Sequence, residues 1–152
     1  MSEKLSSKQV VGEAAATYVK PGMKLGLGTG STVHYFLEAL AGRIQKDVLD
    51  VQGGGTSLET EKHAQRLGIP LITLDEAPHL DLCIDGADEV DNEFRLIKGG
   101  GGALLREKVV ASASEKVIII VGEGKYVETL GHNFLLPIEV LSFGYNQTMK
   151  YV

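Results

Sequence analysis

The segment IDGADEVDNEFRLIKGGGGALLREK, residues 84–108, contains groups that could move a proton beside a bound ligand. Five carboxylates precede Lys98, four consecutive glycines follow it, and Glu107 comes next. Carboxylates held close together raise one another's pKa, so a glutamate among them can act as a base near neutral pH. Glycines are costly to order, which indicates a backbone that approaches a ligand closely or adopts positive φ. The segment therefore predicts an acid–base site beside a glycine loop.

Glu107 is the candidate base because the helix expected at residues 103–113 places it about one turn in, on the face of Ala103. Its side chain would point into the opening of the site. A solvated glutamate between Arg106 and Lys108 is the simpler alternative. Asp85 and Asp88 are expected together on a tight turn that Gly86 permits. A calcium loop is disfavoured because the alternating oxygen ligands and the sixth-position glycine are missing. The other acidic residues of the segment, Glu89, Asp91 and Glu93, are predicted to be solvated loop charges.

A second glycine-rich stretch, GLGTGST at residues 26–32, lies between an expected strand and an expected helix. This layout holds an anion on backbone N–H groups at a helix N-terminus. The dinucleotide fingerprint would need glycine where Ser31 stands, and a Walker loop would need a lysine before Ser/Thr. The hydroxyls of Ser31 and Thr32 instead suit a small phosphate monoester. Ser31 could also simply cap its helix, and the two roles can coexist.

The elements around these motifs alternate between strands and helices. Helices are expected at residues 7–19, 31–40, 58–67 and 103–113, and strands at 24–28, 48–51, 71–74, 82–84, 94–97 and 116–121, with GGGTS at 53–57 as a loop. This alternation predicts a Rossmann-like, doubly wound α/β fold with a mostly parallel sheet. Ligands bind beyond the carboxyl ends of such strands. The motifs GLGTGST, GGGTS, DGADEVD, KGGGG and GEGK follow strands, so they are expected to meet there.

Composition excludes several other classes of protein. The 152 residues carry a formal charge of −5 and no cluster of Lys or Arg, which argues against a nucleic-acid partner. The only cysteine, Cys83, lies in an apolar run and is expected to be a core residue in a reducing compartment. With neither a signal peptide nor a membrane span in the sequence, a cytoplasmic protein without a membrane partner is predicted. The four histidines show no metal-ligand spacing and are interpreted as structural or surface residues: His34, His63, His79 and His132.

The motifs GTGST, DGADE and KGGGGALLREK, with Lys125 further on, resemble those of type A ribose-5-phosphate isomerases. The resemblance covers nearly the whole chain and includes YVKPG at 18–22, LGIP at 67–70 and LPIEV at 136–140. It implies an aldose–ketose isomerase of the pentose phosphate pathway that interconverts D-ribose 5-phosphate and D-ribulose 5-phosphate through an enediolate. It also implies that the enzyme needs no metal and no cofactor.

The resemblance further implies a role for each matching residue. Glu107 would be the general base, Lys98 a candidate oxyanion donor, and Asp85 and Asp88 would orient hydroxyls and assist ring opening. GTGST and a lysine, either Lys98 or Lys125, would hold the phosphate. The implied substrate contacts are Thr29, Gly30, Ser31, Thr32, Asp85, Gly86, Ala87, Asp88, Lys98, Gly99, Gly100, Gly101 and Lys125.

The sequence also departs from the family pattern. Three glycines at 53–55 indicate a more flexible loop than usual, and GEG at 122–124 stands where Asp-x-Ser is commoner. Family chains continue into a small α+β subdomain, so residues 1–132 are expected to form the catalytic domain and 133–152 the beginning of that subdomain. Full-length proteins are expected to be homo-oligomers, either dimers or tetramers.

Three alternatives stay open at this point. One is a noncatalytic sugar-phosphate binding module, which would keep the phosphate loop without needing Glu107. Another is a truncated, inactive isomerase. The third is a different enzyme on the same architecture, such as an amino-sugar phosphate deaminase or a coenzyme A transferase, because fold alone does not decide function. The spacing from KGGGG to Glu107 favours the isomerase.

Overall fold

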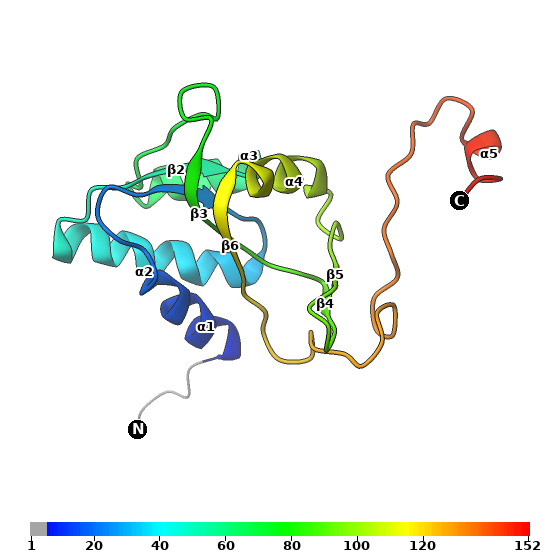
Figure 1. Ribbon diagram of the computed structural model, residues 1–152, viewed down its shortest axis with the longest axis horizontal. Helices are drawn as coiled ribbons and strands as arrows, with labels where there is room; N and C mark the ends of the chain where they lie inside the picture. Colours follow the sequence, from blue (N-terminus) through cyan, green and yellow to red (C-terminus); the bar gives the residue numbers. More distant parts are fainter. Residues whose placement is uncertain (1–5) are drawn as a thin grey trace.

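A four-stranded parallel sheet forms the centre of the molecule. The computed structural model describes residues 6–152 (Figure 1). The strands are β1 (Lys24–Leu27), β2 (Gln52–Gly55), β3 (Leu80–Asp85) and β6 (Ser114–Ile119), and their order across the sheet is β2-β1-β3-β6. All three neighbouring pairs are parallel. The expected α/β class is therefore confirmed.

Helices cover both faces of this sheet. They are α1 (Ser7–Ala16), α2 (Ser31–Asp47), α3 (Leu58–Arg66) and α4 (Leu104–Ser112), followed by the short α5 (Tyr145–Thr148). In Figure 1, α1 and α2 lie together on one side of the strands, and α3 and α4 lie on the other. Successive strand residues point to opposite faces. Leu25 and Leu27 accordingly pack in the α1–α2 core, whereas Cys83 packs with Val110 of α4.

The strand predicted at residues 48–51 is wrong, and the segment predicted as a glycine loop is the real strand. Val48 ends α2 in the left-handed conformation at φ 50°, and the chain then buries Leu49 and Val51 without pairing them. Gln52–Gly55 pairs with β1 through backbone groups alone, which requires no side chains. A Cβ on Gly53 would come within 2.5 Å of Leu27 Cδ1, so the neighbouring strand's side chain fills the space above this glycine.

Two further predicted strands differ from the structure. The segment at residues 71–74 contributes only an isolated bridge between Gly53 and Leu71. The segment at 94–97 shortens to β5 (Leu96–Ile97), which pairs antiparallel with β4 (Glu89–Val90) in a separate two-stranded sheet. Phe94 adopts φ 59° in the turn between them, a conformation that a strand cannot accommodate. The result is a small hairpin that carries Asp88 before β4 and Lys98 after β5.

Residues 133–152 leave the body of the molecule as an extended arm that carries α5 near its end (Figure 1). Its apolar side chains are largely exposed, including Leu135, Leu141 and Phe143. The division of the chain at residue 132 stays a prediction.

Cys83 is fully buried, and burial raises the pKa of its thiol to about 12. The thiol is therefore a packing group at neutral pH, as predicted. Within residues 6–152, no helix combines the length and the hydrophobicity of a membrane span.

Candidate active site

The motifs that follow β1, β3 and β5 meet in one cleft of about 170 Å³ at the carboxyl ends of the strands. The cleft is lined by Lys8, Thr29, Gly30, Ser31, Thr32, Gly86, Ala87, Asp88, Lys98, Gly99, Gly101, Glu107 and Lys125. Of the residues implied as substrate contacts, only Asp85 and Gly100 are not among those that line it. The convergence expected from the strand ends is thus present for four of the five motifs, whereas GGGTS does not line the cleft because its glycines form β2.

Glu107 lies in the first turn of α4, and its side chain is only 8% exposed. Burial raises the pKa of its carboxyl, the negative charge of Asp85 raises it further, and Lys98 opposes both effects. Oε2 lies 3.2 Å from Lys98 Nζ, and no other donor among the described residues bonds to it. A nearly buried carboxylate with a raised pKa and a single protein partner suits a general base. The alternative of a solvated Glu107 is wrong.

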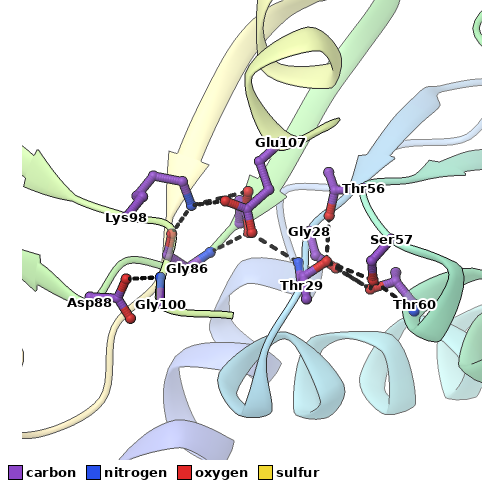
Figure 2. A network of polar contacts seen from close by, with 11 residues as sticks. Gly28, Thr29, Thr56, Ser57, Thr60, Gly86, Asp88, Lys98, Gly100 and Glu107 are labelled. Carbon is purple, nitrogen blue, oxygen red and sulfur yellow. Dashed lines mark hydrogen bonds and ion pairs between the residues drawn. The ribbon is translucent and has the colours of Figure 1, made fainter. Parts of the chain in front are cut away.

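Lys98 joins the two acidic partners of the site. Its ammonium lies 3.2 Å from Asp85 Oδ2 and 3.2 Å from Glu107 Oε2, and it donates to the Gly86 carbonyl. Figure 2 shows Lys98 between Glu107 and Gly86. One positive charge beside two largely buried carboxylates leaves a net negative charge that is shielded from water. This arrangement explains why the pKa of Glu107 stays raised despite the ion pair.

Asp85, at the end of β3, organises the backbone of the site. It is 2% exposed, and its Oδ1 accepts N–H bonds from Thr29 at 3.1 Å and Gly86 at 2.7 Å. Because Oδ2 pairs with Lys98, both oxygens already have protein partners. A Cβ on Gly28 would lie 2.3 Å from Oδ1, so only glycine leaves room for this carboxylate.

Asp88 holds the glycine loop that follows Lys98. Its Oδ2 accepts the Gly100 N–H at 2.9 Å, as Figure 2 shows, and its own N–H donates to the Ile97 carbonyl at 2.8 Å. Gly99 and Gly102 adopt φ of 106° and 72°, the left-handed region that favours glycine. Backbone conformation therefore favours glycine at positions 99 and 102, and the close approach of Asp88 requires it at position 100.

Two helices begin at the cleft without a side-chain cap. Gly30 is the N-cap of α2 and Ala103 is the N-cap of α4, and neither supplies a capping hydrogen bond. The idea that Ser31 caps its helix is wrong, because Ser31 is already the first helical residue. Uncapped N–H groups and the positive ends of the helix dipoles favour bound negative charge. Ser57, by contrast, caps α3 away from this cleft.

Lys8 is a site residue that sequence reasoning missed. Its Nζ donates to Ser31 Oγ at 2.8 Å, which brings a positive charge from α1 to the start of α2. No spacing or motif distinguishes Lys8 from the other lysines of the chain, so only the packing of α1 against α2 reveals it. Lys125 lines the same cleft, and its Nζ lies 5.9 Å from the Phe134 ring centroid, within cation–π range.

Two residues predicted to be solvated loop charges, Glu89 and Asp91, are buried at 1% exposure each. Glu89 accepts N–H bonds from Gly131, Asn133 and Phe134 at 2.6, 2.6 and 2.8 Å. Asp91 caps its own turn by accepting N–H bonds from residues 93 and 95. Backbone donors satisfy Glu89, and backbone donors together with the Arg95 side chain, 2.6 Å from Oδ2, satisfy Asp91, which explains their burial. Glu93 is exposed, as predicted.

A larger groove of about 520 Å³ lies between α3, α4 and residues 71–76, but neither Glu107 nor Lys98 lines it. Its lining is mostly apolar, with an Arg106–Glu61 ion pair at 2.7 Å. In the described part of the chain, no cluster of three His, Cys, Asp or Glu side chains could hold a metal ion. The smaller polar cleft is therefore the candidate active site.

Fold and site together define a class of parallel α/β protein in which a carboxylate with a raised pKa and two uncapped helix N-termini that favour anions share one cleft. Residues 53–152 match the family described as ribose 5-phosphate isomerase A (phosphoriboisomerase A). This match covers more than half of the chain. The chain therefore belongs to that family, and the resemblance drawn from its motifs is confirmed.

Individual relatives agree with the family assignment. The chain is 53% identical over 146 residues to ribose-5-phosphate isomerase A of Bacillus mycoides, covering 96% of this chain and 65% of that protein. A solved Plasmodium falciparum ribose 5-phosphate isomerase shares 46% identity at a TM-score of 0.89, over 95% of this chain and 63% of the other. A D-ribose-5-phosphate isomerase solved with phospho-erythronic acid shares 34% identity at a TM-score of 0.92, over 95% and 64%. The chain thus spans about two thirds of each relative's length.

Proposed function

We propose that this chain carries the catalytic site of an isomerase that interconverts D-ribose 5-phosphate and D-ribulose 5-phosphate in the pentose phosphate pathway. The observation that carries the proposal is the position of Glu107. A nearly buried carboxylate with a raised pKa, whose Oε2 has Lys98 as its only described partner, faces a cleft that also presents the uncapped start of α4. An aldose–ketose isomerase needs this combination.

The reaction moves one proton between neighbouring carbons. Glu107 takes the C2 proton of the open-chain aldose, and the electron pair of the broken C–H bond forms the C1–C2 double bond while O1 becomes negative. Lys98 and the N–H groups at the start of α4 stabilise that oxyanion. The proton then returns to C1, and the O2 proton passes to O1, so O2 becomes the ketone oxygen. No atom is gained or lost.

The phosphate group belongs at the opposite side of the cleft. The start of α2 offers uncapped N–H groups, Ser31 and Thr32 offer hydroxyls, and Lys8 and Lys125 supply positive charge. A dianionic phosphate monoester matches these donors in charge and geometry. Lys98 is already committed to two carboxylates. We therefore assign Lys98 to the reacting oxygens and the other two lysines to the phosphate.

The relative solved with phospho-erythronic acid supports this assignment of chemistry. That compound carries a phosphate and a planar carboxylate on a short hydroxylated chain. Its carboxylate presents two negative oxygens near the position where an enediolate develops charge. A protein that stabilises an enediolate is expected to bind such an acid.

The two aspartates of the site have different proposed roles. Both oxygens of Asp85 already have protein partners, so Asp85 acts through Lys98 and the backbone of the site. Asp88 is assigned to a sugar hydroxyl.

Turnover of D-ribose 5-phosphate in the presence of a chelator tests the proposal, with the wild-type chain compared to Glu107→Gln. Conversion that falls about 10²- to 10⁴-fold in the variant is the expected result, the range typical for loss of a general base. A folded wild-type chain that binds the sugar phosphate without converting it would instead support a noncatalytic binding module or an inactive isomerase. Equal turnover by both proteins would refute the role of Glu107.

Two broader features are also part of the proposal. Assembly into a homo-oligomer and a cytoplasmic location both fit a metabolic enzyme of this family. Sedimentation analysis and fractionation of cells expressing the protein measure them directly.

A further inference from the structure

Four hydroxyl groups form a cluster directly behind the GTGST loop, and the proposed mechanism does not use them. Thr29 Oγ1 lies 2.7 Å from Thr56 Oγ1, 2.9 Å from Ser57 Oγ and 3.2 Å from Thr60 Oγ1. Figure 2 shows these side chains converging from the end of β1, the end of β2 and the first turn of α3. Thr56 and Thr60 are 0% and 2% exposed. The cluster is thus an interior feature that joins three elements.

The directions of these hydrogen bonds follow from counting protons. Each hydroxyl has one proton to donate and two lone pairs that accept. Thr60 donates to the Gly28 carbonyl at 2.8 Å, an acceptor without a proton of its own. Ser57 Oγ then donates to Thr60 at 3.0 Å, and Thr29 donates to Ser57. This series of hydrogen bonds therefore ends at the carbonyl of Gly28, the residue that precedes Thr29.

Both hydrogen-bond donors of Thr29 already have acceptors in this arrangement. Its hydroxyl proton goes to a neighbouring hydroxyl in the cluster, and its backbone N–H goes to Asp85 Oδ1. Phosphate oxygens accept hydrogen bonds and donate none when ionised, so they require free donors. Ser31 differs, because its oxygen accepts from Lys8 while its own proton has no acceptor among the described residues. Ser31 can therefore donate to a phosphate, whereas Thr29 cannot without breaking the cluster.

We propose that Thr29, Thr56, Ser57 and Thr60 form a positioning network that fixes the phosphate-binding loop, and that Thr29 is not itself a donor to the phosphate. This inference rests on the proposed function, which places a sugar phosphate at the loop. Thr56 N also donates to the Leu27 carbonyl at 2.8 Å, so the network continues the pairing of β1 with β2. Thr56 and Ser57, which follow the three glycines, thereby hold the loop at residues 28–32 in place from the interior of the protein.

The test measures melting temperature without ligand and calorimetric affinity for inorganic phosphate in four variants of the full chain. Thr60→Val removes the terminal donor, and Thr60→Ser is its matched control because it keeps the hydroxyl. Thr29→Val removes the central hydroxyl, and Ser31→Ala removes a proposed phosphate donor. Wild-type turnover of D-ribose 5-phosphate is recorded separately as the readout of the proposed function alone.

We expect both valine variants to melt at least about 3 °C lower and to bind phosphate about 5- to 10-fold more weakly, because a buried partner is left unpaired and the loop loosens. Thr60→Ser should keep the melting temperature and the phosphate affinity of the wild-type chain. Ser31→Ala should weaken phosphate binding at an unchanged melting temperature. The proposal is overturned if Thr29→Val behaves like Ser31→Ala, if Thr60→Val melts lower with unchanged phosphate affinity, or if the wild-type chain binds no phosphate. A chain that binds phosphate without turnover contradicts only the proposed function, since the variants still report on the network.

Discussion

Asp85→Asn should cost stability and change the acid–base behaviour of the site at the same time. The amide oxygen can keep the two N–H bonds from Thr29 and Gly86, but its NH₂ group replaces Oδ2 at 3.2 Å from the Lys98 ammonium. Two donors then face each other. Breaking a buried ion pair costs about 3–5 kcal/mol, and we discount this to about 2–3 kcal/mol because Lys98 keeps Glu107 and the Gly86 carbonyl as partners.

Thermal unfolding measures this cost directly. At about 3 °C per kcal/mol for a chain of this size, the melting temperature should fall by about 6–9 °C. Asp88→Asn is the matched control, because its carboxylate accepts a single N–H bond and pairs with no cation within 4 Å among the described residues, so a much smaller shift is expected. Removing the Asp85 charge should also lower the pKa of Glu107, which that charge raises. An Asp85→Asn melting temperature within about 2 °C of wild type would refute this reasoning.

Three more predictions follow from the same contacts. Gly100→Ala should lower the melting temperature and weaken binding of D-ribose 5-phosphate about 10-fold by calorimetry, because its Cβ would lie 2.5 Å from a ring carbon of Phe134 and 2.9 Å from an Asp88 oxygen. Gly101→Ala, whose Cβ would meet no described protein atom within 4 Å, should melt at the wild-type temperature. Glu107 must be deprotonated to act, so kcat/KM should fall as pH drops through its raised pKa. Lys98→Met should move this fall in kcat/KM to higher pH, because the charge of Lys98 lowers the pKa of Glu107. A pH profile that does not move would contradict the assignment of Glu107 as the base. Burial raises the pKa of Glu89, but three backbone hydrogen bonds outweigh it and hold the pKa below its usual range. Glu89→Gln should therefore lower the melting temperature most at neutral pH and progressively less as pH falls through that pKa, while hydrogen exchange speeds up at the three bonded amides; a deficit that does not depend on pH would contradict it.

The general architecture could be predicted because strands and helices alternate with clear periodicity. The glycine strand could not be predicted, because Gly53–Gly55 contribute only backbone groups to pairing and carry no side-chain pattern. The apolar residues at 48–51 suggested a strand, but Leu49 and Val51 are buried in the core from an irregular segment, and Val48 is exposed. A pattern of side chains reports burial more reliably than it reports hydrogen bonding.

The candidate site was predictable where motif and chemistry coincide, as at Lys98 and Glu107. Lys8 was not, because its role comes from the packing of α1 against α2 rather than from its sequence neighbours. Glu89 was misjudged for a related reason, since its three donors lie more than 40 residues away in the chain. Long-range backbone donors leave no trace in the local sequence around a carboxylate.

The most direct test of the central claim is proton exchange at C2 of D-ribose 5-phosphate in D₂O, followed by NMR with a chelator present. We expect the wild-type chain to introduce deuterium at C2 of the aldose or C1 of the ketose. The Glu107→Gln variant should do so about 10²- to 10⁴-fold more slowly while still binding the sugar phosphate. Exchange at the wild-type rate in a folded Glu107→Gln protein would contradict the assignment of Glu107 as the base.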